Sequence, residues 1–396
     1  MFWSPTGGGV RRYLLAKHAW WCAQPGWRHT IAVPRTAGAP RLAATLPSLP
    51  VPGSGGYRLP LRRGAMARVL TRLAPSVIEA GDPYRVAWAA RDAAQQLGIP
   101  AVAYCHSNIE QMAGLVGSRY FGAAAGRAAR RYARHVYGGF DLVLAPSRDM
   151  ARHLRDWGLA RVACQPLGVD SAMFSPARAD PSWRLRHGFD AATRVLVYVG
   201  RFAPEKHLDV LVDAVRRLGP PYALVVVGTG PTPPPADPRV RVLPFVAGTA
   251  ELAAILASAD AFVHAGDQET FGLSVLEAMA CGTPAVVRKA GGLAELVEGG
   301  TGVGVAAGTG EAFAEAIRDL FDGDIAVLSR AARQRGVAGD WQRVLPELLR
   351  RYCRLLGMND DSTAEAAETA EAAEPVDTAE PTRPHRRAVG ASEALS

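Results

Sequence analysis

Residues 260–298 read DAFVHAGDQETFGLSVLEAMACGTPAVVRKAGGLAELVE, and the fold class follows from how this stretch divides. Asp260–His264 is a short apolar run of strand length, and Ala265–Phe271 is a polar loop. Ser274 stands three residues before Glu277, which is the spacing of a capping box and predicts a helix start here. The stretch therefore predicts a strand, a loop and a helix in succession.

The predicted helix is short, because Gly282 is placed to end it and Pro284 cannot extend it. Ala285–Val287 then supplies the next strand. In an α/β layout, phosphate-bearing ligands bind where a loop enters a helix at the carboxyl end of a strand. Two carboxylates, Glu269 and Glu277, lie on that loop and helix, so the pattern indicates a ligand site.

Three motifs in this stretch form one combined pattern. They are Glu269-Thr-Phe-Gly, Glu277-Ala-Met-Ala-Cys-Gly-Thr-Pro and Gly291-Gly-Leu-Ala-Glu295. The pattern resembles the donor-site signature of GT4-type (group 1) retaining glycosyltransferases, and the resemblance covers roughly residues 5–356. It implies the GT-B fold, in which two Rossmann-like domains with parallel sheets face each other across a cleft.

The rest of the chain shows the same alternation of elements. The other strand candidates are Thr30–Val33, Val77–Glu79, Ala101–Tyr104, Leu142–Leu144, Val195–Val199, Ala223–Val227 and Val240–Leu243. The helix candidates are Val10–Trp21, Leu208–Leu218, Glu251–Ala257, Glu311–Phe321 and Trp341–Leu356. The alternation predicts βαβ units and an α/β fold with parallel sheets.

The chain of 396 residues is long enough for two domains. With the resemblance it divides into an N-terminal Rossmann-like acceptor domain (1–168), an interdomain linker (169–190), a C-terminal Rossmann-like nucleotide-sugar donor domain (191–340), a helix crossing back to the first domain (341–356) and an acidic tail (357–396). The tail is rich in Ala, Glu, Thr and Pro and has few large apolar groups, so we expect it to be disordered.

Composition indicates the cellular compartment of the protein and the charge of the partners that it would bind. Five scattered cysteines without CxxC spacing favour reduced thiols and a cytoplasmic location. No export signal or membrane span is indicated. The net charge is +8, but nine acids and three arginines beyond residue 358 leave +14 on the body of the protein. A basic body suits nucleotide diphosphates, anionic lipid head groups or nucleic acid.

The beginning of the sequence is unusual for this family, which starts with an apolar strand running into a Gly-Gly loop. Here Met1–Pro5 leads almost at once to three glycines, and we expect the recorded start to lie downstream of the true one. The glycines precede a predicted helix, whose N-terminal N–H groups can face an anion. The resemblance implies that Gly8 and Gly9 let the backbone approach the diphosphate and leave room for the acceptor. A plain tight turn is the alternative.

Two basic residues follow the strand Val195–Val199, in the run Gly200-Arg201-Phe-Ala-Pro-Glu205-Lys206. Fixed cations can neutralise the charge that grows on a departing nucleoside diphosphate without a metal. Arg201 offers a planar fork for phosphate oxygens, and Lys206 offers a compact charge. The resemblance assigns both to the diphosphate, against the alternative of solvated surface cations. The family often has glycine after this lysine, whereas this chain has His207.

The resemblance also assigns the two carboxylates. It implies that Glu277 binds the ribose hydroxyls, since a carboxylate accepts two hydrogen bonds from a diol; the alternative is that Glu277 only closes the capping box. It implies that Glu269 binds hydroxyls of the transferred sugar. The backbone N–H groups of Phe271, Gly272 and Leu273 would meet the sugar and the distal phosphate.

His106 ends the predicted strand Ala101–Tyr104 at the edge facing the expected cleft. The matching family histidine contacts the primary hydroxyl of the donor sugar. Without that resemblance, a histidine at a strand end is as readily structural.

Four arginines, Arg127, Arg130, Arg131 and Arg134, fall on one helical stripe. They suggest a peripheral contact with an anionic membrane at its inner face, and a solvated helix face is the alternative. Nucleic acid is not expected, because no aromatic-interleaved basic module or zinc spacing is present.

No HxH, HExxH or DxD cluster indicates a metal, and we expect metal-independent catalysis without a cofactor. The sequence thus predicts a hexosyltransferase that moves a sugar from GDP-mannose or a UDP-hexose to a lipid, glycan or small-molecule acceptor with retention of configuration. The catalytic residues would be Arg201, Lys206, Glu269 and His106. The alternatives are a GT-B sugar epimerase and a non-catalytic nucleotide-sugar-binding protein.

Overall fold

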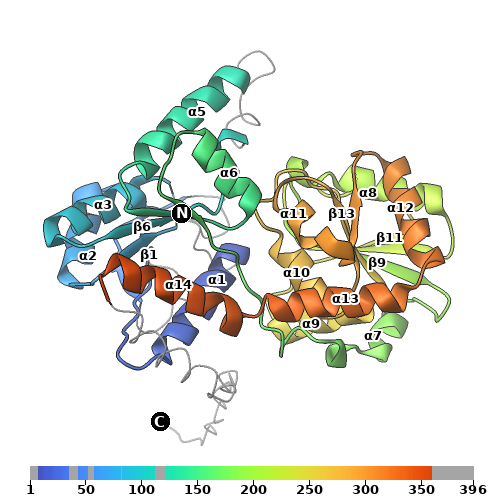
Figure 1. Cartoon of the computed structure of the whole chain (residues 1–396). Coiled ribbons are helices and arrows are strands. Elements are labelled where there is room, and N and C mark those ends of the chain that lie inside the picture. The colour runs from blue at the N-terminus through green and yellow to red at the C-terminus, as the bar shows by residue number, and fades with distance from the viewer. Residues whose placement is uncertain (1–7, 35–42, 52–57, 82, 112–121, 359–396) are drawn as a thin grey trace, which may run out of the picture.

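The computed structural model of the protein describes residues 8–34, 43–51, 58–81, 83–111 and 122–358. It shows two α/β domains that lie side by side, each built on parallel strands with helices around them (Figure 1). The predicted fold class is therefore confirmed. The expectations for Met1–Pro5 and for the tail beyond Met358 lie outside the described residues.

The second domain has six parallel strands in the order β11-β10-β9-β12-β13-β14. Their bounds are β9 Arg194–Val199, β10 Tyr222–Val227, β11 Val240–Leu243, β12 Ala261–His264, β13 Ala285–Arg288 and β14 Val303–Val305. The strand order reverses between β9 and β12, which are neighbours in space. In such sheets, ligands bind at the carboxyl ends of the strands at this reversal.

Helices cover this sheet. They are α8 Leu208–Leu218, α9 Thr249–Ser258, α10 Leu273–Ala280, α11 Gly291–Leu296, α12 Gly310–Asp322 and α13 Ile325–Ala338. All six residues of β10 are buried, as expected for a parallel strand covered on both faces. The sequence did not predict β14 or α13, because β14 is three residues long with a central glycine and α13 contains Gly336, which lowers helix propensity.

The first domain has four parallel strands in the order β5-β6-β7-β8. The bounds are β5 Ile78–Ala80, β6 Ala101–Tyr104, β7 Leu142–Ala145 and β8 Val162–Cys164, and the helices are α1 Gly9–Cys22, α2 Arg63–Arg72, α3 Arg85–Leu97, α5 Gly122–Tyr137 and α6 Arg148–Asp156. Two small sheets accompany them: β1 Ala32–Pro34 with β2 Ala44–Leu46, and β3 Leu49–Pro50 with β4 Arg58–Leu59. A cavity of about 1300 Å³ separates β1 from β5.

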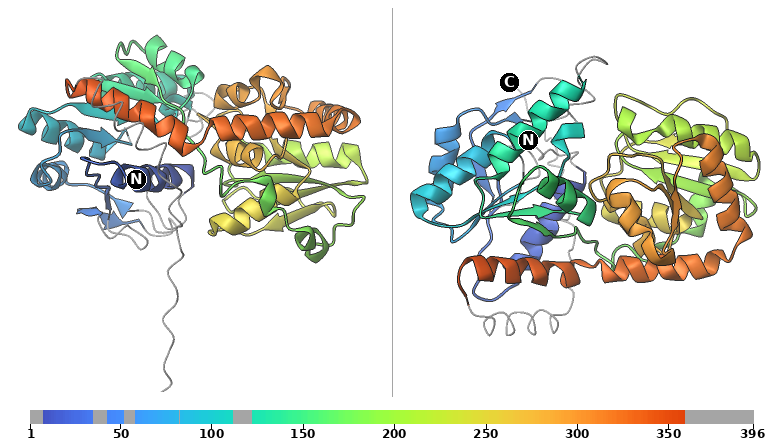
Figure 2. Two further views of the ribbon diagram at one scale, coloured as in Figure 1. Left: turned by 60° about the horizontal axis from the view of Figure 1, so that its bottom comes forward. Right: turned by 45° about the horizontal axis from the view of Figure 1, so that its top comes forward.

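The chain crosses between the domains twice, and the two crossings are bonded to each other. The Val169 N–H donates to the carbonyl of Gly339 (2.9 Å), and the Trp341 N–H donates to the carbonyl of Val169 (3.1 Å). The second crossing leads into α14 (Trp341–Leu355), which packs against α1 of the first domain. Figure 2 shows α13 and α14 running one after the other along both domains.

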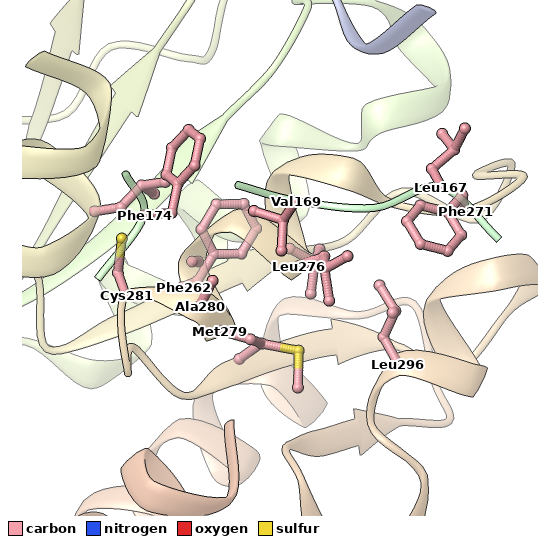
Figure 3. Packing of buried hydrophobic residues seen from close by; sticks show 14 of the residues in the cluster. Leu167, Val169, Phe174, Phe262, Phe271, Leu276, Met279, Ala280, Cys281 and Leu296 are labelled. Atoms are coloured by element: carbon pink, nitrogen blue, oxygen red, sulfur yellow. The ribbon is translucent and has the colours of Figure 1, made fainter. Parts of the chain in front are cut away.

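Residues 169–190, predicted as a linker, contain a 3₁₀ turn at Pro176–Arg178 and the helix α7 at Pro181–Arg186. Both pack against α9 of the second domain. Upstream of them, the crossing segment contributes Val169 and Phe174 to an apolar cluster that includes Leu276 and Met279 of α10 (Figure 3). One apolar core thus continues from the second domain into the crossing segment.

Candidate active site

The candidate site lies where loops from the two domains meet. In the second domain, one loop follows β9 and another follows β12, on either side of the reversal in strand order. In the first domain, His106 follows β6. The Thr270 hydroxyl, on the loop after β12, donates a hydrogen bond to the His106 carbonyl (3.0 Å), so this edge of the first domain faces the loop directly.

Glu269 occupies the centre of that loop. Its Oε1 lies 2.5 Å from Lys206 Nζ and 3.3 Å from His264 Nε2. The Gly266 N–H donates to His264 Nδ1 (3.1 Å), which makes Nδ1 the acceptor and leaves the Nε2 proton for Glu269. Burial raises the pKa of Glu269, but the charge of Lys206 and the hydrogen bond from His264 outweigh it and hold the pKa well below its usual range. Glu269 is therefore ionised at neutral pH.

The third sequence motif, which begins at Gly291, packs against the backbone of this loop. The Gly292 N–H donates to the Glu269 carbonyl (2.8 Å). A Cβ added at Gly292 would lie 2.5 Å from the Thr270 carbonyl oxygen, so any larger residue would push the loop away. Gly292 thus fixes the position of Glu269 through its backbone.

The helix α10 begins at Leu273, and its N-cap is Gly272 with φ of +94°. This left-handed conformation suits glycine. The predicted capping box is wrong: no side chain caps this helix, because Ser274 is its second residue and Glu277 bonds elsewhere. The Val275 N–H donates to the Gly272 carbonyl (3.0 Å), whereas the N–H groups of Leu273 and Ser274 precede the first intrahelical bond and remain available to an anion.

Arg201 and Lys206 lie on the same loop in different surroundings. The Lys206 side chain is 12% exposed and held by Glu269, whereas the Arg201 side chain is 69% exposed and bonds Glu205 (2.8 Å). His207 has φ of +48°, a left-handed conformation that favours glycine, the residue that the family resemblance implies at this position. Lys206 is therefore the largely buried cation of this loop, and Arg201 is the exposed one.

Glu277 is the most deeply buried carboxylate of the site, with its side chain 2% exposed. Its Oε1 pairs with the Arg12 guanidinium, which comes from α1 in the opposite domain. Burial raises the pKa of Glu277 although the charge of Arg12 opposes that rise. The carboxylate is thus held by a cation of the other domain.

His106 is buried and stacks on Tyr104, with ring centroids 4.3 Å apart and an interplanar angle of 8°. Burial lowers its pKa to about 4, with the charge of Glu79 opposing the shift and that of Lys17 adding to it. Its Nε2 is buried and has no hydrogen-bond partner among the described residues. The ring is therefore neutral, and its Nε2 keeps unused hydrogen-bonding capacity among the described residues.

We expect His106 to make the protein less stable in acid. The unfolded chain takes up a proton near pH 6.5 and the folded chain only near pH 4, so stability falls as the pH drops through this window. The loss between pH 7.5 and 4.5 is roughly 2.5 kcal/mol. Urea unfolding at both pH values checks this: His106→Asn is expected to lose that much less than the wild-type protein, and an equal loss in both would show that His106 is not buried neutral.

The glycine run at the start of α1 lies beside the start of α10. Gly8 is the N-cap of α1 and Gly9 its first residue, so the helix begins one residue before the predicted Val10, while Gly7 lies outside the described residues. A Cβ added at Gly9 would lie 3.3 Å from Leu273 Cδ2. The start of α1 therefore touches the start of α10.

Three residues of the site were not predicted from the sequence: Arg12, His264 and Thr270. His264 ends the strand that leads into the signature, and that position was a usable signal. Arg12 acts on Glu277 over a separation of 265 residues, for which no spacing in the sequence gives a signal.

The arginine stripe lies on α5, which stands away from the candidate site (Figure 1). Arg127, Arg131 and Arg134 are exposed, and Arg130 lies 3.8 Å from Glu110. Together with Arg91 of α3 they line a surface hollow of about 930 Å³. The predicted stripe is confirmed as one basic face.

Within the described residues, no group of three or more His, Cys, Asp or Glu side chains is arranged to hold a metal ion. Nor does that part of the chain contain a helix with the length and apolar character needed to cross a membrane.

The chain matches two family models and is similar to curated proteins. The model of Glycosyltransferase Family 4 matches residues 7–172, and that of Glycosyl transferases group 1 matches residues 193–323. The chain is 31% identical over 369 residues to a GDP-mannose-dependent alpha-(1-6)-phosphatidylinositol dimannoside mannosyltransferase of Mycobacterium tuberculosis, covering 88% of this chain and 93% of that protein. It is 36% identical over 261 residues to a GDP-mannose-dependent alpha-mannosyltransferase of Mycolicibacterium smegmatis, covering 64% and 66%.

Solved structures share the fold. The chain is similar to sucrose-phosphate synthase from Thermosynechococcus elongatus, with a TM-score of 0.70 and 21% identity over 89% of this chain and 94% of that one. It is also similar to a glycosyltransferase from Rickettsia africae, with a TM-score of 0.68 and 16% identity. That match covers 88% of this chain and 95% of the other. At these identities the likeness shows the two-domain fold alone.

Proposed function

Because the chain belongs to glycosyltransferase family 4, we propose that it is a retaining mannosyltransferase whose donor is GDP-mannose. The observation that carries the proposed chemistry is the arrangement of Lys206, Glu269 and His264 at the reversal in strand order. Support for the donor comes from relatives that use GDP-mannose, one of them similar over nearly its whole length.

In the proposed reaction, the acceptor oxygen attacks the anomeric carbon from the side of the leaving group. The bond from that carbon to the phosphate oxygen breaks, and the acceptor proton passes to the departing phosphate. Lys206 has three N–H donors, of which one holds Glu269, so two remain for phosphate oxygens. Arg201, on the same loop, contacts the same phosphates, and the two positive charges stabilise the leaving group without a metal.

The sugar is held by neutral and anionic groups of opposite domains. Glu269 is ionised and fixed by two partners, so it accepts hydrogen bonds from sugar hydroxyls. His106 presents a neutral ring nitrogen from the first domain. Binding the sugar between them orients its anomeric carbon toward the acceptor.

The donor is tested by a thermal-shift and product-release screen with GDP-mannose, UDP-glucose and ADP-glucose in EDTA. We expect GDP-mannose to raise the melting temperature and GDP to appear only when acceptor is added. Stabilisation by UDP-glucose instead of GDP-mannose would show that the donor is a UDP-sugar. GDP release without acceptor would favour the epimerase or hydrolase alternative, and stabilisation without turnover would favour a binding protein.

We propose that the acceptor is a lipid at the inner face of the cytoplasmic membrane. The similar Mycobacterium tuberculosis protein acts on phosphatidylinositol dimannoside. The stripe on α5 supports the same idea, because Arg127 and Arg131 are exposed and form no ion pair within the described part of the chain. Arginines near an anionic surface contribute about 1 kcal/mol each to binding.

Reversing two of these charges is expected to weaken membrane binding. The double variant Arg127→Glu/Arg131→Glu should bind vesicles containing 30% anionic phospholipid at least tenfold more weakly than the wild-type protein, by about 1 kcal/mol per residue. Vesicle sedimentation measures this. Arg330→Glu/Arg343→Glu, which changes two exposed arginines of α13 and α14, is the matched control. An equal loss in both variants would mean that net charge, and not α5, directs binding.

A further inference from the structure

Glu277 has one satisfied oxygen and one unsatisfied oxygen. Oε1 is bonded by Arg12, whereas Oε2 is buried and has no hydrogen-bond partner among the described residues. A buried acceptor without a partner costs about 1–3 kcal/mol. The hydroxyls of a bound ribose would supply the missing donor to Oε2.

We propose that Arg12 is a positioning residue for the ribose of the donor: from the opposite domain it holds Oε1 of Glu277 and so leaves Oε2 directed to the ribose diol. The inference rests on the proposed function, because it takes Glu277 as the ribose ligand. Arg12 acts through Glu277 and is not itself assigned a contact with the donor.

The contact requires the two domains to be together. Arg12 lies on α1 and Glu277 on α10, and Gly9 of α1 touches Leu273 of α10 at the same place. The Arg12 side chain is 30% exposed, while that of Glu277 is 2% exposed. A guanidinium keeps its charge throughout the physiological pH range, so Arg12 supplies a constant positive partner to Glu277 in this arrangement of the domains.

The other groups near Glu277 do not replace Arg12. Cys281 follows on the same helix, and burial together with the charge of Glu277 raises the pKa of its thiol to about 12, so the thiol is neutral. Arg333 of α13 is bonded to the carbonyls of Ser171, Phe174 and Ala280. Among the described residues, Arg12 is the one cation that opposes the rise in the pKa of Glu277 caused by burial.

Removing Arg12 therefore changes how ribose binding depends on pH. A buried carboxylate without a cation has its pKa raised by several units, which brings it into the range of ordinary assays. The protonated form is uncharged and presents an O–H donor in place of one acceptor, so it binds the diol more weakly, and affinity falls as pH falls through that pKa. The loss approaches about tenfold for each pH unit below it.

The experiment measures binding of GDP by calorimetry to the wild-type protein, Arg12→Leu and Arg12→Lys at pH 6, 7 and 8. We expect Arg12→Leu to bind GDP at least tenfold more weakly than wild type at pH 6 and to recover much of that loss at pH 8. Arg12→Lys should show a smaller loss and a shallower pH dependence. A second probe, 2′,3′-dideoxy-GDP, lacks the diol, and its affinity is expected to be nearly the same in the wild-type protein and Arg12→Leu.

A matched control separates this role from simple tethering of the domains. Glu298→Gln removes another ion pair between the domains, Arg148–Glu298, outside the donor site, and should leave GDP binding unchanged. If Arg12→Leu binds GDP like wild type, or weakens GDP and the dideoxy probe equally, the inference is overturned while the proposed function stands. If the wild-type protein binds neither GDP nor UDP, both are overturned.

Discussion

Replacing Lys206 by alanine is expected to lower kcat by about 10³-fold while leaving the fold intact. The lysine side chain is 12% exposed and fixed by Glu269, so its charge is already in place before the diphosphate begins to leave. Removing one preorganised group that stabilises developing charge costs about 10²–10³-fold in kcat, and the loss of a full positive charge belongs at the upper end. Steady-state kinetics with GDP-mannose and a lipid acceptor measure this fall in kcat.

The matched control is Lys289→Ala, an exposed lysine of the same domain. It is expected to retain wild-type kinetics. Circular dichroism and melting temperature should show that Lys206→Ala is folded. A folded Lys206→Ala protein with near-normal kcat would show that Lys206 is not a catalytic residue.

Glu269→Gln is expected to lower kcat/KM by about 10²–10³-fold, because the fixed anion that receives the sugar hydroxyls becomes neutral. The change is nearly isosteric, so the amide oxygen can still accept from His264 and the fold should be retained. The native carboxylate has a pKa held well below its usual range, so it is ionised throughout assays at pH 6–8. The deficit should therefore be the same at each pH.

Glu251→Gln, an exposed glutamate on α9, is the comparison variant and should behave as wild type. If Glu269→Gln loses activity only because KM for the acceptor rises, Glu269 would belong to the acceptor site. A deficit that vanishes at any pH between 6 and 8 would contradict the fixed charge.

The elements with strong hydrophobic patterns were predictable to the residue. Ala101–Tyr104, Val240–Leu243 and Leu208–Leu218 begin and end where the sequence analysis places them, and the predicted strand Asp260–His264 begins one residue later, at Ala261. Ala101–Tyr104 and Ala261–His264 are buried strands and Leu208–Leu218 is an amphipathic helix, so local pattern and tertiary burial favour the same structure, whereas Val240–Leu243 is a partly exposed strand at the edge of its sheet. Shorter elements such as Val162–Cys164 carry too few residues to show a period.

Single residues of the candidate site were predictable from the sequence, but the contacts between them were not. Glu269 and Glu277 lie within one stretch, but the partner of each comes from elsewhere: Lys206 from the loop after β9, and Arg12 from the other domain. The capping box failed for a physical reason, since the left-handed Gly272 takes the N-cap position one residue before the helix begins. The spacing of residues in the sequence does not show which partner a side chain contacts in the fold.

The central claim is that this chain moves mannose from GDP-mannose to a lipid with retention and without a metal. The most direct test uses GDP-[¹⁴C]mannose, vesicles containing a phosphatidylinositol mannoside, and EDTA. We predict that label passes to the lipid, that GDP is released in equal amount, and that the product shows an α-anomeric signal by NMR. A β-linked product, label released as free mannose, or activity that depends on added metal would contradict the account.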